Sequence, residues 1–446
     1  MTTDKNANGR KLAAFITGMR TRELPPEVLD AARMCLADWL GVALGAHDED
    51  AGRVVRETAA GWKSQGKSTV IFGKGNAAAP FAALANGTLA HCLDFDDTYV
   101  KAITHTSAPV WAATLALGEE TGATESEMLA AYITGFETAC RAGYGMGEAV
   151  TARGWHSTGV FGRIGAAAAS AALLKLNEEQ TLHALGAAAT QTAGLTASFG
   201  TMAKPFHAGK AAMDGVLSAQ LAAGGFHAAT NLLEPGGGLD GAVVQDKSAR
   251  IQPADFSGWE ILNNSFKPYA SCHLTHPAID AARSMAKQLN DGEVKSIRAD
   301  VGALALQVTG EKSGAPATPL EGKFDMKYCI ALALRGRTLS AADFREPWRR
   351  DEAALAYASK VYVHAASDMG FASARVTVER ANGEILIEEV AVAKGHPGNP
   401  LTWDDMWAKF SGLNEDRLGA RTRGLFDAVR GFGNGSALTA IRANAV

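Results

Sequence analysis

The stretch NGTLAHCLDFDDTYVKAITHTSA, residues 86–108, holds more reactive side chains than any other part of this chain. Acid–base chemistry on a small acidic molecule needs carboxylates and imidazoles close together, and this stretch brings both into one short segment. Its polar members are His91, Asp94, Asp96, Asp97, Thr98, Tyr99 and His105.

Three fragments further along have a similar character. They are GWHSTG (154–159), GTMAKPFHAG (200–209) and KPYASCHLTHPAID (267–280). Each sets a Lys or His beside Gly or Pro, where a loop can aim a side chain into a cleft. Together with residues 86–108, they indicate an enzyme that moves protons on a carboxylate substrate.

The chain around these fragments is Ala-rich and helical in pattern up to about residue 265. Pro25 and Pro26 precede a helical pattern, with proline in its tolerated first-turn place. The segments 124–127 and 177–180 are capping-box patterns, each followed by apolar residues at helical spacing. Small residues throughout 162–176 permit close helix–helix approach. This part of the chain is therefore predicted to be all-helical.

The pattern changes after about residue 268 and returns to helical at Thr402. Alternating residues predict strands, and Ala-Asn-Gly at 381–383 predicts a hairpin turn. The predicted strands are 294–301, 360–364, 375–379 and 384–388, and the predicted helices are 323–334 and 341–358. The expected fold class is mainly α. A large all-helical domain (1–266 plus 400–446) would carry a smaller inserted α+β domain (267–399).

Composition excludes several classes of protein. A chain of 446 residues is too long to fold around a single hydrophobic core. Its net charge of −4 provides no positively charged surface that would attract nucleic acid. The five cysteines are scattered with no CxxC pair, which argues against a disulfide framework and a metal cluster. Neither a signal-like N-terminus nor an apolar run of about 18 residues is found. We expect a cytoplasmic protein that binds neither nucleic acid nor membrane.

The DFDD segment is the first candidate for chemistry. On a helix, Asp94 and Asp97 would share a face with Thr98 and His91, while Asp96 would point elsewhere. Neighbouring carboxylates repel one another, which raises the pKa of at least one of them and makes it a usable acid or base. A solvated acidic face or a helix C-terminus is the plain alternative, and a Mg²⁺ site is a third one.

Histidines and lysines of the other fragments supply further candidates. His105 and His156 each precede a predicted helix, close to where an anion would bind. Lys204 and Lys267 each precede a proline, which favours an extended or turn conformation and holds the lysine in place. Such lysines could bind substrate carboxylates or, if desolvated, act as a base, and Arg163 and Arg153 could serve the same end.

The last fragment offers a different set of groups. Cys272 and His276 are spaced to face one way on a helix and suggest zinc, but no third or fourth ligand can be assigned. A structural or substrate-facing role for Cys272 and His273 is preferred. Tyr328 stands on a predicted helix, where it is either a proton donor or part of the core.

The four fragments resemble the MmgE/PrpD family. The combination NG…H.LDFDDT…H.S, G.HSTG.FG, FGTM.KP.HAG and KPY.SC..THPAIDAA carries the resemblance, which extends from about Lys11 to Ala437. Family members include 2-methylcitrate dehydratase, cis-aconitate decarboxylase and iminodisuccinate epimerase. The resemblance implies a large helical domain with a smaller α+β domain, a homodimer, and no metal or organic cofactor.

The resemblance also implies a set of site residues. Those proposed in the decarboxylase branch correspond here to Asp94, Thr98, His105, His156, Lys204, Lys267 and, for a family tyrosine, Tyr328. Two positions depart from the pattern. Cys272 stands where the decarboxylase has a histidine, with His273 next to it, and the usual His-Pro-Ser is His105-Thr106-Ser107. The first departure weakens a decarboxylase interpretation.

The family members share one chemical task, which is to handle a proton or a carboxylate at a carbon next to a carboxyl group. Cationic groups stabilise the enolate-like charge, and a base takes the proton. We expect a cofactor-independent epimerase of iminodisuccinate type acting on a dicarboxylate, or alternatively a dehydratase of 2-methylcitrate or a related acid. A decarboxylase and a non-catalytic carboxylate-binding protein are less favoured. The expected catalytic residues are His105, His156, Lys267, Tyr328 and Asp94, and the expected substrate-binding residues are Lys204, Thr98, Cys272, His273 and Arg163.

Overall fold

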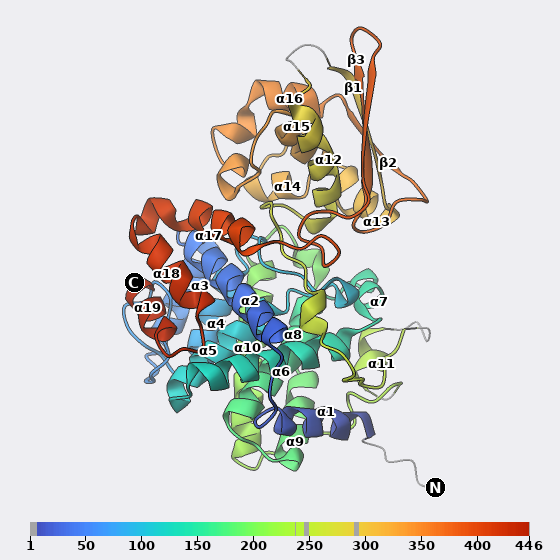
Figure 1. The fold of residues 1–446 in the computed structure, drawn as a ribbon. Coiled ribbons are helices and arrows are strands. Elements are labelled where there is room, and N and C mark those ends of the chain that lie inside the picture. Colours follow the sequence, from blue (N-terminus) through green and yellow to red (C-terminus); the bar gives the residue numbers. More distant parts are fainter. Residues whose placement is uncertain (1–6, 237, 245–248, 290–293, 446) are drawn as a thin grey trace. The chain divides into compact units, whose positions relative to one another are not determined.

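The computed structural model describes residues 7–236, 238–244, 249–289 and 294–445. The chain forms two compact units, one made of residues 1–265 with 406–446 and the other of residues 266–405 (Figure 1). The first is built of helices and the second combines helices with a small sheet, so the predicted mainly α fold class is confirmed. The domain limits expected from the sequence, 1–266 with 400–446 and 267–399, stay a prediction.

The first unit is a packed set of helices in which α10 contacts both α4 and α8, and α8 also contacts α5 and α6. The helices are α1 (Ala7–Gly18), α2 (Pro26–Gly45), α3 (Asp50–Gly61), α4 (Ala79–Ala90), α5 (Ser107–Thr121), α6 (Glu125–Gly143), α7 (Gly147–Ala152), α8 (Ser157–Leu173), α9 (Glu178–Ala189), α10 (Ala203–Ala223), α11 (Leu239–Val243), α17 (Trp403–Leu418), α18 (Arg421–Arg430) and α19 (Ala437–Asn444), with short turns η1 (Val100–Ala102), η2 (Thr196–Ser198) and η3 (Glu260–Asn263).

Local sequence signals place the starts of several helices. Pro26 opens α2 in the first turn. The Thr124 hydroxyl accepts a hydrogen bond from the Glu127 backbone N–H at 3.2 Å, and the Glu127 carboxylate accepts one from the Thr124 N–H at 2.9 Å. Asn177 and Gln180 form the same reciprocal cap on α9. Both predicted capping boxes are therefore confirmed.

Small residues allow α8 to approach its neighbours closely. A Cβ on Gly165 would lie 2.7 Å from the carbonyl oxygen of Gly135 on α6, and a Cβ on Gly215 of α10 would lie 2.4 Å from the Cβ of Ala166. Neither contact leaves room for a methyl group. The predicted close approach along 162–176 is confirmed, and α8 packs against α5, α6 and α10.

The core of the first unit is aromatic as well as Ala-rich. The Trp111 and Tyr132 rings stack with centroids 4.0 Å apart, and the Trp39 indole donates a hydrogen bond to the Ala108 carbonyl at 3.2 Å.

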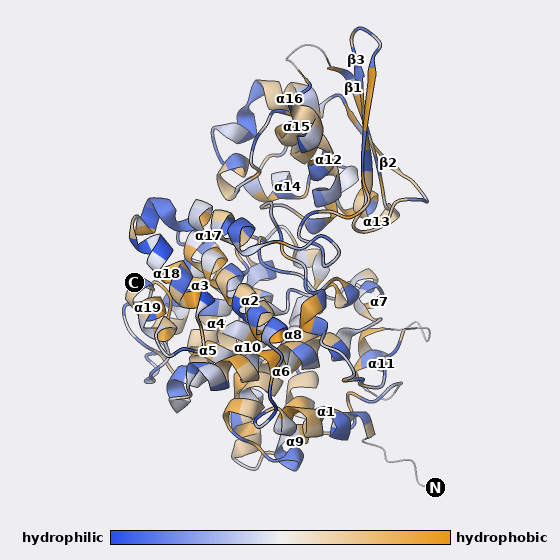
Figure 2. Cartoon of the chain, viewed as in Figure 1, coloured by the Kyte–Doolittle hydropathy of each residue, from blue (hydrophilic) through white to orange (hydrophobic). Residues whose placement is uncertain are grey.

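Hydrophilic residues are prominent on α17 and α18 near the C-terminus (Figure 2). Among the described residues, no helix has the length and apolar character that a membrane span requires.

The second unit contains a four-stranded sheet in the order β2-β1-β3-β4, where β1 pairs parallel with β2 and antiparallel with β3. Helix α12 packs on β3 and β4. The elements are α12 (His276–Ala286), β1 (Val294–Val301), α13 (Ala303–Ala305), α14 (Pro319–Lys323), α15 (Met326–Leu334), α16 (Glu352–Ala358), β2 (Val361–Ala365), β3 (Ala374–Arg380) and β4 (Ile385–Val390), with turns η4 (His273–Thr275), η5 (Leu306–Gly310), η6 (Ala341–Phe344) and η7 (Trp348–Arg350). All four predicted strands and the hairpin are confirmed.

One predicted helix of this unit is wrong. Residues 341–358 form η6, η7 and then α16 instead of one continuous helix. Pro347 falls in the middle of the segment, where it supplies no N–H and disfavours a helical conformation at the residue before it. Asp351 then caps the N-terminus of α16, because its carboxylate accepts a hydrogen bond from the Ala353 N–H at 3.0 Å.

Candidate active site

The DFDD segment is a turn and not a helix. Helix α4 ends at Ala90, and Asp94 adopts a left-handed backbone with φ of 52°. The prediction that Asp94, Asp97, Thr98 and His91 share a helix face is therefore wrong. The left-handed residue reverses the chain, so Asp94 and Asp96 both face the same group of histidines. A short acidic side chain tolerates this conformation better than most residues.

Lys204 forms an ion pair with Asp94. Its Nζ lies 2.6 Å from Asp94 Oδ1, and both side chains are buried. Lys204 belongs to the first turn of α10, so the extended or turn conformation predicted for the Lys-Pro step is wrong. Pro205 is accommodated there because the first turn of a helix needs no N–H from proline.

His105 lies beside both aspartates of the turn. Its Nε2 is 3.7 Å from Asp94 Oδ1 and its Nδ1 is 3.2 Å from Asp96 Oδ2. The His105 backbone N–H donates to the Thr158 hydroxyl at 3.0 Å, which ties the start of α5 to the start of α8. The prediction that His105 precedes a helix beginning at Ser107 is confirmed.

Asp96, which was expected to point elsewhere, faces this group instead. His91 Nδ1 lies 2.9 Å and 2.8 Å from the two oxygens of its carboxylate. The His91 ring lies 4.6 Å from the His105 ring and 5.7 Å from the His156 ring, measured between centroids. The expectation about Asp96 fails because it assumed helical spacing in a segment that turns.

His156 occupies the N-cap position of α8, as predicted, with its backbone N–H donating to the Gly194 carbonyl at 3.0 Å. Its Nδ1 lies 3.1 Å from His207 Nδ1, so one of the two imidazoles donates and the other accepts. The Phe199 ring meets His156 edge-on, with centroids 4.9 Å apart, and lies 5.3 Å from Lys204 Nζ. Phe199 thus covers one side of the cluster.

Three histidines of this cluster are uncharged at neutral pH. Burial lowers the pKa of His91 to about 4 and that of His207 to about 4. Burial, His91 and Lys204 together lower the pKa of His156 well below its usual value. Burial would raise the pKa of Asp96, but the adjacent imidazoles outweigh it and hold that pKa low. The cluster therefore combines an ionised Asp96 carboxylate with imidazoles that are neutral at pH 7.

Asp97 belongs to a separate buried network. Its carboxylate accepts hydrogen bonds from the Ser107 hydroxyl and from the Asn264 amide, the latter at 2.6 Å. Its backbone N–H donates to Asp38, whose other oxygen pairs with Lys409 at 2.5 Å. Burial, followed by the charge of Asp38, raises the pKa of Asp97 to about 7. Through these contacts Asp97 anchors the turn that follows α4.

Two other predicted residues of the first unit have mainly structural contacts. Thr98 is buried, and its backbone N–H donates to the Ser265 carbonyl at 2.8 Å. Arg163 is also buried, and its guanidinium bonds Asp214 at 2.9 Å and the Gly159 carbonyl. Substrate binding by Thr98 and Arg163 stays a prediction, and for Arg163 the pairing with Asp214 gives it no support.

The remaining predicted residues lie in the second unit. Lys267 is buried, and Cys272 is half-buried with its backbone N–H donating to the Lys323 carbonyl at 2.8 Å. The expected single helix face for Cys272 and His276 is wrong, because Cys272 precedes η4 and His276 starts α12. The convergence of Lys267 and Cys272 with the histidine cluster stays a prediction.

His273 and Tyr328 complete the second group. The His273 ring lies 4.9 Å from the His276 ring and 5.5 Å from the Phe371 ring. The Tyr328 hydroxyl on α15 donates to the Trp348 carbonyl at 3.1 Å, and burial raises its pKa above the usual value. A phenol held in this way is a poor base.

The cluster also offers ligands for a metal ion. Within the described ranges, His91, Asp94, Asp96 and His105 place ligand atoms within 4.8 Å of one another. Lys204 already supplies a positive charge to Asp94 at 2.6 Å. The arrangement therefore fits either a bound cation or an acid–base cluster with its own ammonium group.

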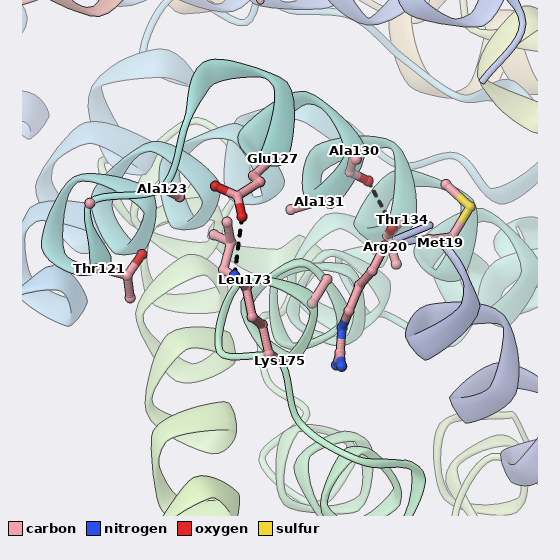
Figure 3. Close-up of a pocket in the computed structure, with 12 residues that line it drawn as sticks. Met19, Arg20, Thr121, Ala123, Glu127, Ala130, Ala131, Thr134, Leu173 and Lys175 are labelled. Atoms are coloured by element: carbon pink, nitrogen blue, oxygen red, sulfur yellow. Dashed lines mark hydrogen bonds and ion pairs between the residues drawn. The ribbon is translucent and has the colours of Figure 1, made fainter. Parts of the chain in front are cut away.

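A large pocket of the first unit lies away from this chemistry. It has a volume of about 490 Å³, and its lining includes Arg20, Glu127 and Lys175 but no member of the cluster (Figure 3). Lys175 and Glu127 form an ion pair across it at 3.2 Å. Its lining holds alanine and glycine beside a few charged residues and has no histidine, so we place the chemistry at the histidine cluster.

Sequence reasoning missed several residues of the cluster. Asp96 was misplaced, and His91, His207 and Phe199 were not selected although all three stand in or beside the quoted fragments. His207 is three residues after Lys204 on α10, and that spacing on a predicted helix would have placed both on one face. His91 was grouped with the DFDD residues but given no role, and Phe199 carries no comparable signal.

Comparison with known proteins defines the class to which this fold and cluster belong. The model of the MmgE/PrpD N-terminal domain matches residues 10–252, and that of the MmgE/PrpD C-terminal domain matches residues 269–429. The chain belongs to the MmgE/PrpD family.

Three relatives give the range of similarity. The cis-aconitate decarboxylase-like protein oryM of Aspergillus oryzae is 28% identical over 93% of this chain and 94% of its own length. Cis-aconitate decarboxylase of Aspergillus terreus is 28% identical over 77% of this chain and 75% of its own. The enzyme of the same name from Homo sapiens is 25% identical over 89% of this chain and 86% of its own. Kinship with iminodisuccinate epimerase in particular is not seen in these comparisons.

Proposed function

We propose that the protein is a lyase that acts on a small di- or tricarboxylic acid, generating charge on a carbon next to a carboxyl group. The observation that carries this proposal is the buried Asp94–Lys204 pair with neutral histidines beside it. Lys204 provides an ammonium group near a substrate carboxylate, and His105 provides a nitrogen that can accept or return a proton.

Two lyase reactions fit these groups. In a dehydration, a base removes the proton from the carbon, an acid protonates the neighbouring hydroxyl as its C–O bond breaks, and the loss of water gives an alkene. In a decarboxylation, the C–C bond to a carboxylate breaks, CO₂ departs, and the electron pair left on carbon takes a proton from an acid. Both pass through an enolate-like charge that Lys204 would stabilise.

Several observations favour a lyase over an epimerase. Two of the relatives named above are cis-aconitate decarboxylases by name, and the third is named as decarboxylase-like. An epimerase also needs a second base on the opposite face, and Tyr328, one residue expected there, has a raised pKa and donates to a backbone carbonyl. The homodimer, the cytoplasmic location and the roles of Lys267 and Cys272 remain part of the proposal.

A substrate screen tests the proposal directly. The purified protein is incubated in deuterated buffer with cis-aconitate, 2-methylcitrate and other di- and tricarboxylates, and the reactions are followed by proton NMR. A lyase converts at least one acid into a new alkene, with CO₂ released or water lost, and Lys204→Met abolishes the conversion. Deuterium exchange with inversion and no new alkene would identify an epimerase, and no exchange with any acid would refute catalysis.

A further inference from the structure

The turn that follows α4 also contacts a buried lysine that is not part of the histidine cluster. Lys409 lies on α17, and its Nζ is 2.5 Å from Asp38 Oδ1 on α2 and 2.6 Å from the carbonyl oxygen of Phe95. The side chains of Lys409 and Asp38 are 4% and 1% exposed. Phe95 stands between Asp94 and Asp96, so the ammonium group reaches the backbone at the centre of the turn.

Asp38 extends this interaction to the next peptide group of the turn. Its second carboxylate oxygen accepts a hydrogen bond from the Asp97 N–H at 3.0 Å. The Phe95 carbonyl and the Asp97 N–H belong to the two peptide groups on either side of Asp96. Because peptide groups are planar, a residue has only two soft backbone dihedral angles, and holding both neighbouring peptide groups restricts both angles. The pair of Lys409 and Asp38 therefore restricts the direction in which the Asp96 side chain leaves the backbone.

The direction of the Asp96 side chain matters because its carboxylate contacts two imidazoles. Oδ2 lies 2.8 Å from His91 Nδ1 and 3.2 Å from His105 Nδ1. Two positions earlier, Asp94 has a left-handed φ of 52° and pairs with Lys204. A displacement of about 1 Å at a reacting group can cost about 100-fold in rate, so a turn that carries both carboxylates has to be held firmly.

We propose that Lys409 is a positioning residue that, together with Asp38, fixes the backbone around Asp96 and keeps the carboxylates of the turn directed at the histidine cluster. The kinetic part of this inference rests on the proposed function, and it deepens that function by adding a residue that acts from outside the site. Stability alone is a weak explanation for the pair, because apolar residues of similar size often replace a buried ion pair without loss. Apolar residues cannot supply a donor for the Phe95 carbonyl together with an acceptor for the Asp97 N–H.

Close packing of α17 on α2 brings Lys409 to this position (Figure 1). A Cβ on Gly41 would lie only 2.8 Å from Cδ2 of Phe410, the residue that follows Lys409. Gly41 is three positions after Asp38, so the two residues share a face of α2. Further along α17, Asn414 donates to the Gly41 carbonyl at 3.0 Å and to the Phe410 carbonyl at 2.9 Å. Asn414 thus joins the same two helices, and among the described residues it hydrogen-bonds no atom of the turn, which makes it a matched control.

The first test needs no substrate, so its outcome is separate from that of the proposed function. Hydrogen–deuterium exchange with mass spectrometry compares the wild type with the double variant Asp38→Asn/Lys409→Met, in which the pair leaves no buried charge. Because the Phe95 carbonyl loses its donor, we expect the peptide covering residues 91–99 to exchange about 10-fold faster, with little change in the α8 peptide covering residues 157–173. An increase in the turn no larger than that in α8, including no increase at all, would overturn the inference. Should the double variant not fold, the same comparison is made on Lys409→Gln.

The second test combines urea unfolding with steady-state kinetics on the acid identified by the substrate screen. Lys409→Met leaves Asp38 buried without its partner and should lose stability, and the double variant should largely recover that loss. We expect kcat of the double variant to stay about 30-fold or more below the wild type, with KM changed less, and kcat of Asn414→Leu to stay within about 3-fold.

The comparison of stability with turnover decides between a positioning and a purely structural role. Recovery of kcat together with stability in the double variant would refute the positioning role of Lys409, as would an equal loss of kcat in Asn414→Leu. If the wild type turns over no acid in the screen, the proposed function fails, and the exchange test still decides whether Lys409 holds the turn.

Discussion

Lys204 and Asp94 are 110 positions apart in the chain, yet their charged atoms lie 2.6 Å from each other in the buried part of the first unit. The pair joins the first turn of α10 to the turn that follows α4. Taking either charge away leaves the other buried and unpaired, which costs far more than the pair itself contributes. The contact is therefore a test of the fold as well as of the site.

Lys204→Met should reduce the free energy of unfolding by about 3–5 kcal/mol, because the Asp94 carboxylate loses its partner. The double variant Asp94→Asn with Lys204→Met should recover a large part of that loss, since no buried charge remains. Urea titrations of the wild type, both single variants and the double variant form the required cycle. Lys175→Met, on an exposed lysine, is the control, and strictly additive losses would show that the two side chains are not coupled.

The pH dependence of stability should report the buried His91. Its folded-state pKa of about 4 is below the value near 6.5 of the unfolded chain, so the unfolded state binds the proton first as the pH falls. This group therefore destabilises the fold progressively between pH 6.5 and 4. The His91→Asn variant should lose about 2–3 kcal/mol less than the wild type between pH 7 and 4.5. Equal slopes for the two proteins would contradict the neutral, buried state of His91.

Asp97 should act in the opposite direction over a similar range. Its folded-state pKa of about 7 exceeds the unfolded value near 3.8, so the folded state holds the proton longer and stability is lost as the pH rises from about 4 to 7. Asp97→Asn cannot ionise, and its amide oxygen can still accept from Ser107 and Asn264. Relative to wild type, this variant should gain about 3 kcal/mol between pH 5 and 8. A stability difference that does not change with pH would rule this out.

The turn after α4 shows where sequence reasoning succeeds and where it fails. Capping boxes, hairpin turns and runs of small residues depend on only a few neighbouring positions. Predictions from them are therefore confirmed at Thr124, at 381–383 and at Gly165. Asp96 was misplaced because a left-handed backbone at Asp94 cannot be read from the residue type. That conformation follows from long-range contacts, such as the bond from the Thr98 N–H to the Ser265 carbonyl.

The buried cations Lys204 and Arg163 show the same limit of reasoning from sequence. Fragments rich in Lys, His and Gly indicated the chemistry, and four of their members do meet in the first unit: Asp94, His105, His156 and Lys204. Arg163 looked equivalent in sequence but pairs with Asp214 on the neighbouring helix. The partner of a buried cation depends on which helix faces it, and spacing along one helix does not determine that.

Phe199 should contribute to catalytic efficiency through its contacts with His156 and Lys204. The edge-on ring and the nearby ammonium each represent a modest interaction, so Phe199→Leu should lower kcat/KM by roughly 3- to 10-fold. Phe226→Leu, on another exposed aromatic residue, is the matched control. Steady-state kinetics on the acid found in the screen measure the effect. An unchanged kcat/KM would show that the ring does not border the bound substrate.

Metal dependence should show whether the group of His91, Asp94, Asp96 and His105 binds a metal ion or works as an acid–base cluster without one. We expect that dialysis against EDTA leaves turnover unchanged, because Lys204 supplies the positive charge at Asp94. Added Zn²⁺ should inhibit, since two imidazoles and two carboxylates are ligands that this ion accepts and its binding would block His105. Inhibition should weaken in His91→Asn, which removes one ligand but leaves an N–H donor for Asp96. Loss of turnover with EDTA that Mg²⁺ or Zn²⁺ restores would instead show that the cluster works as a metal site.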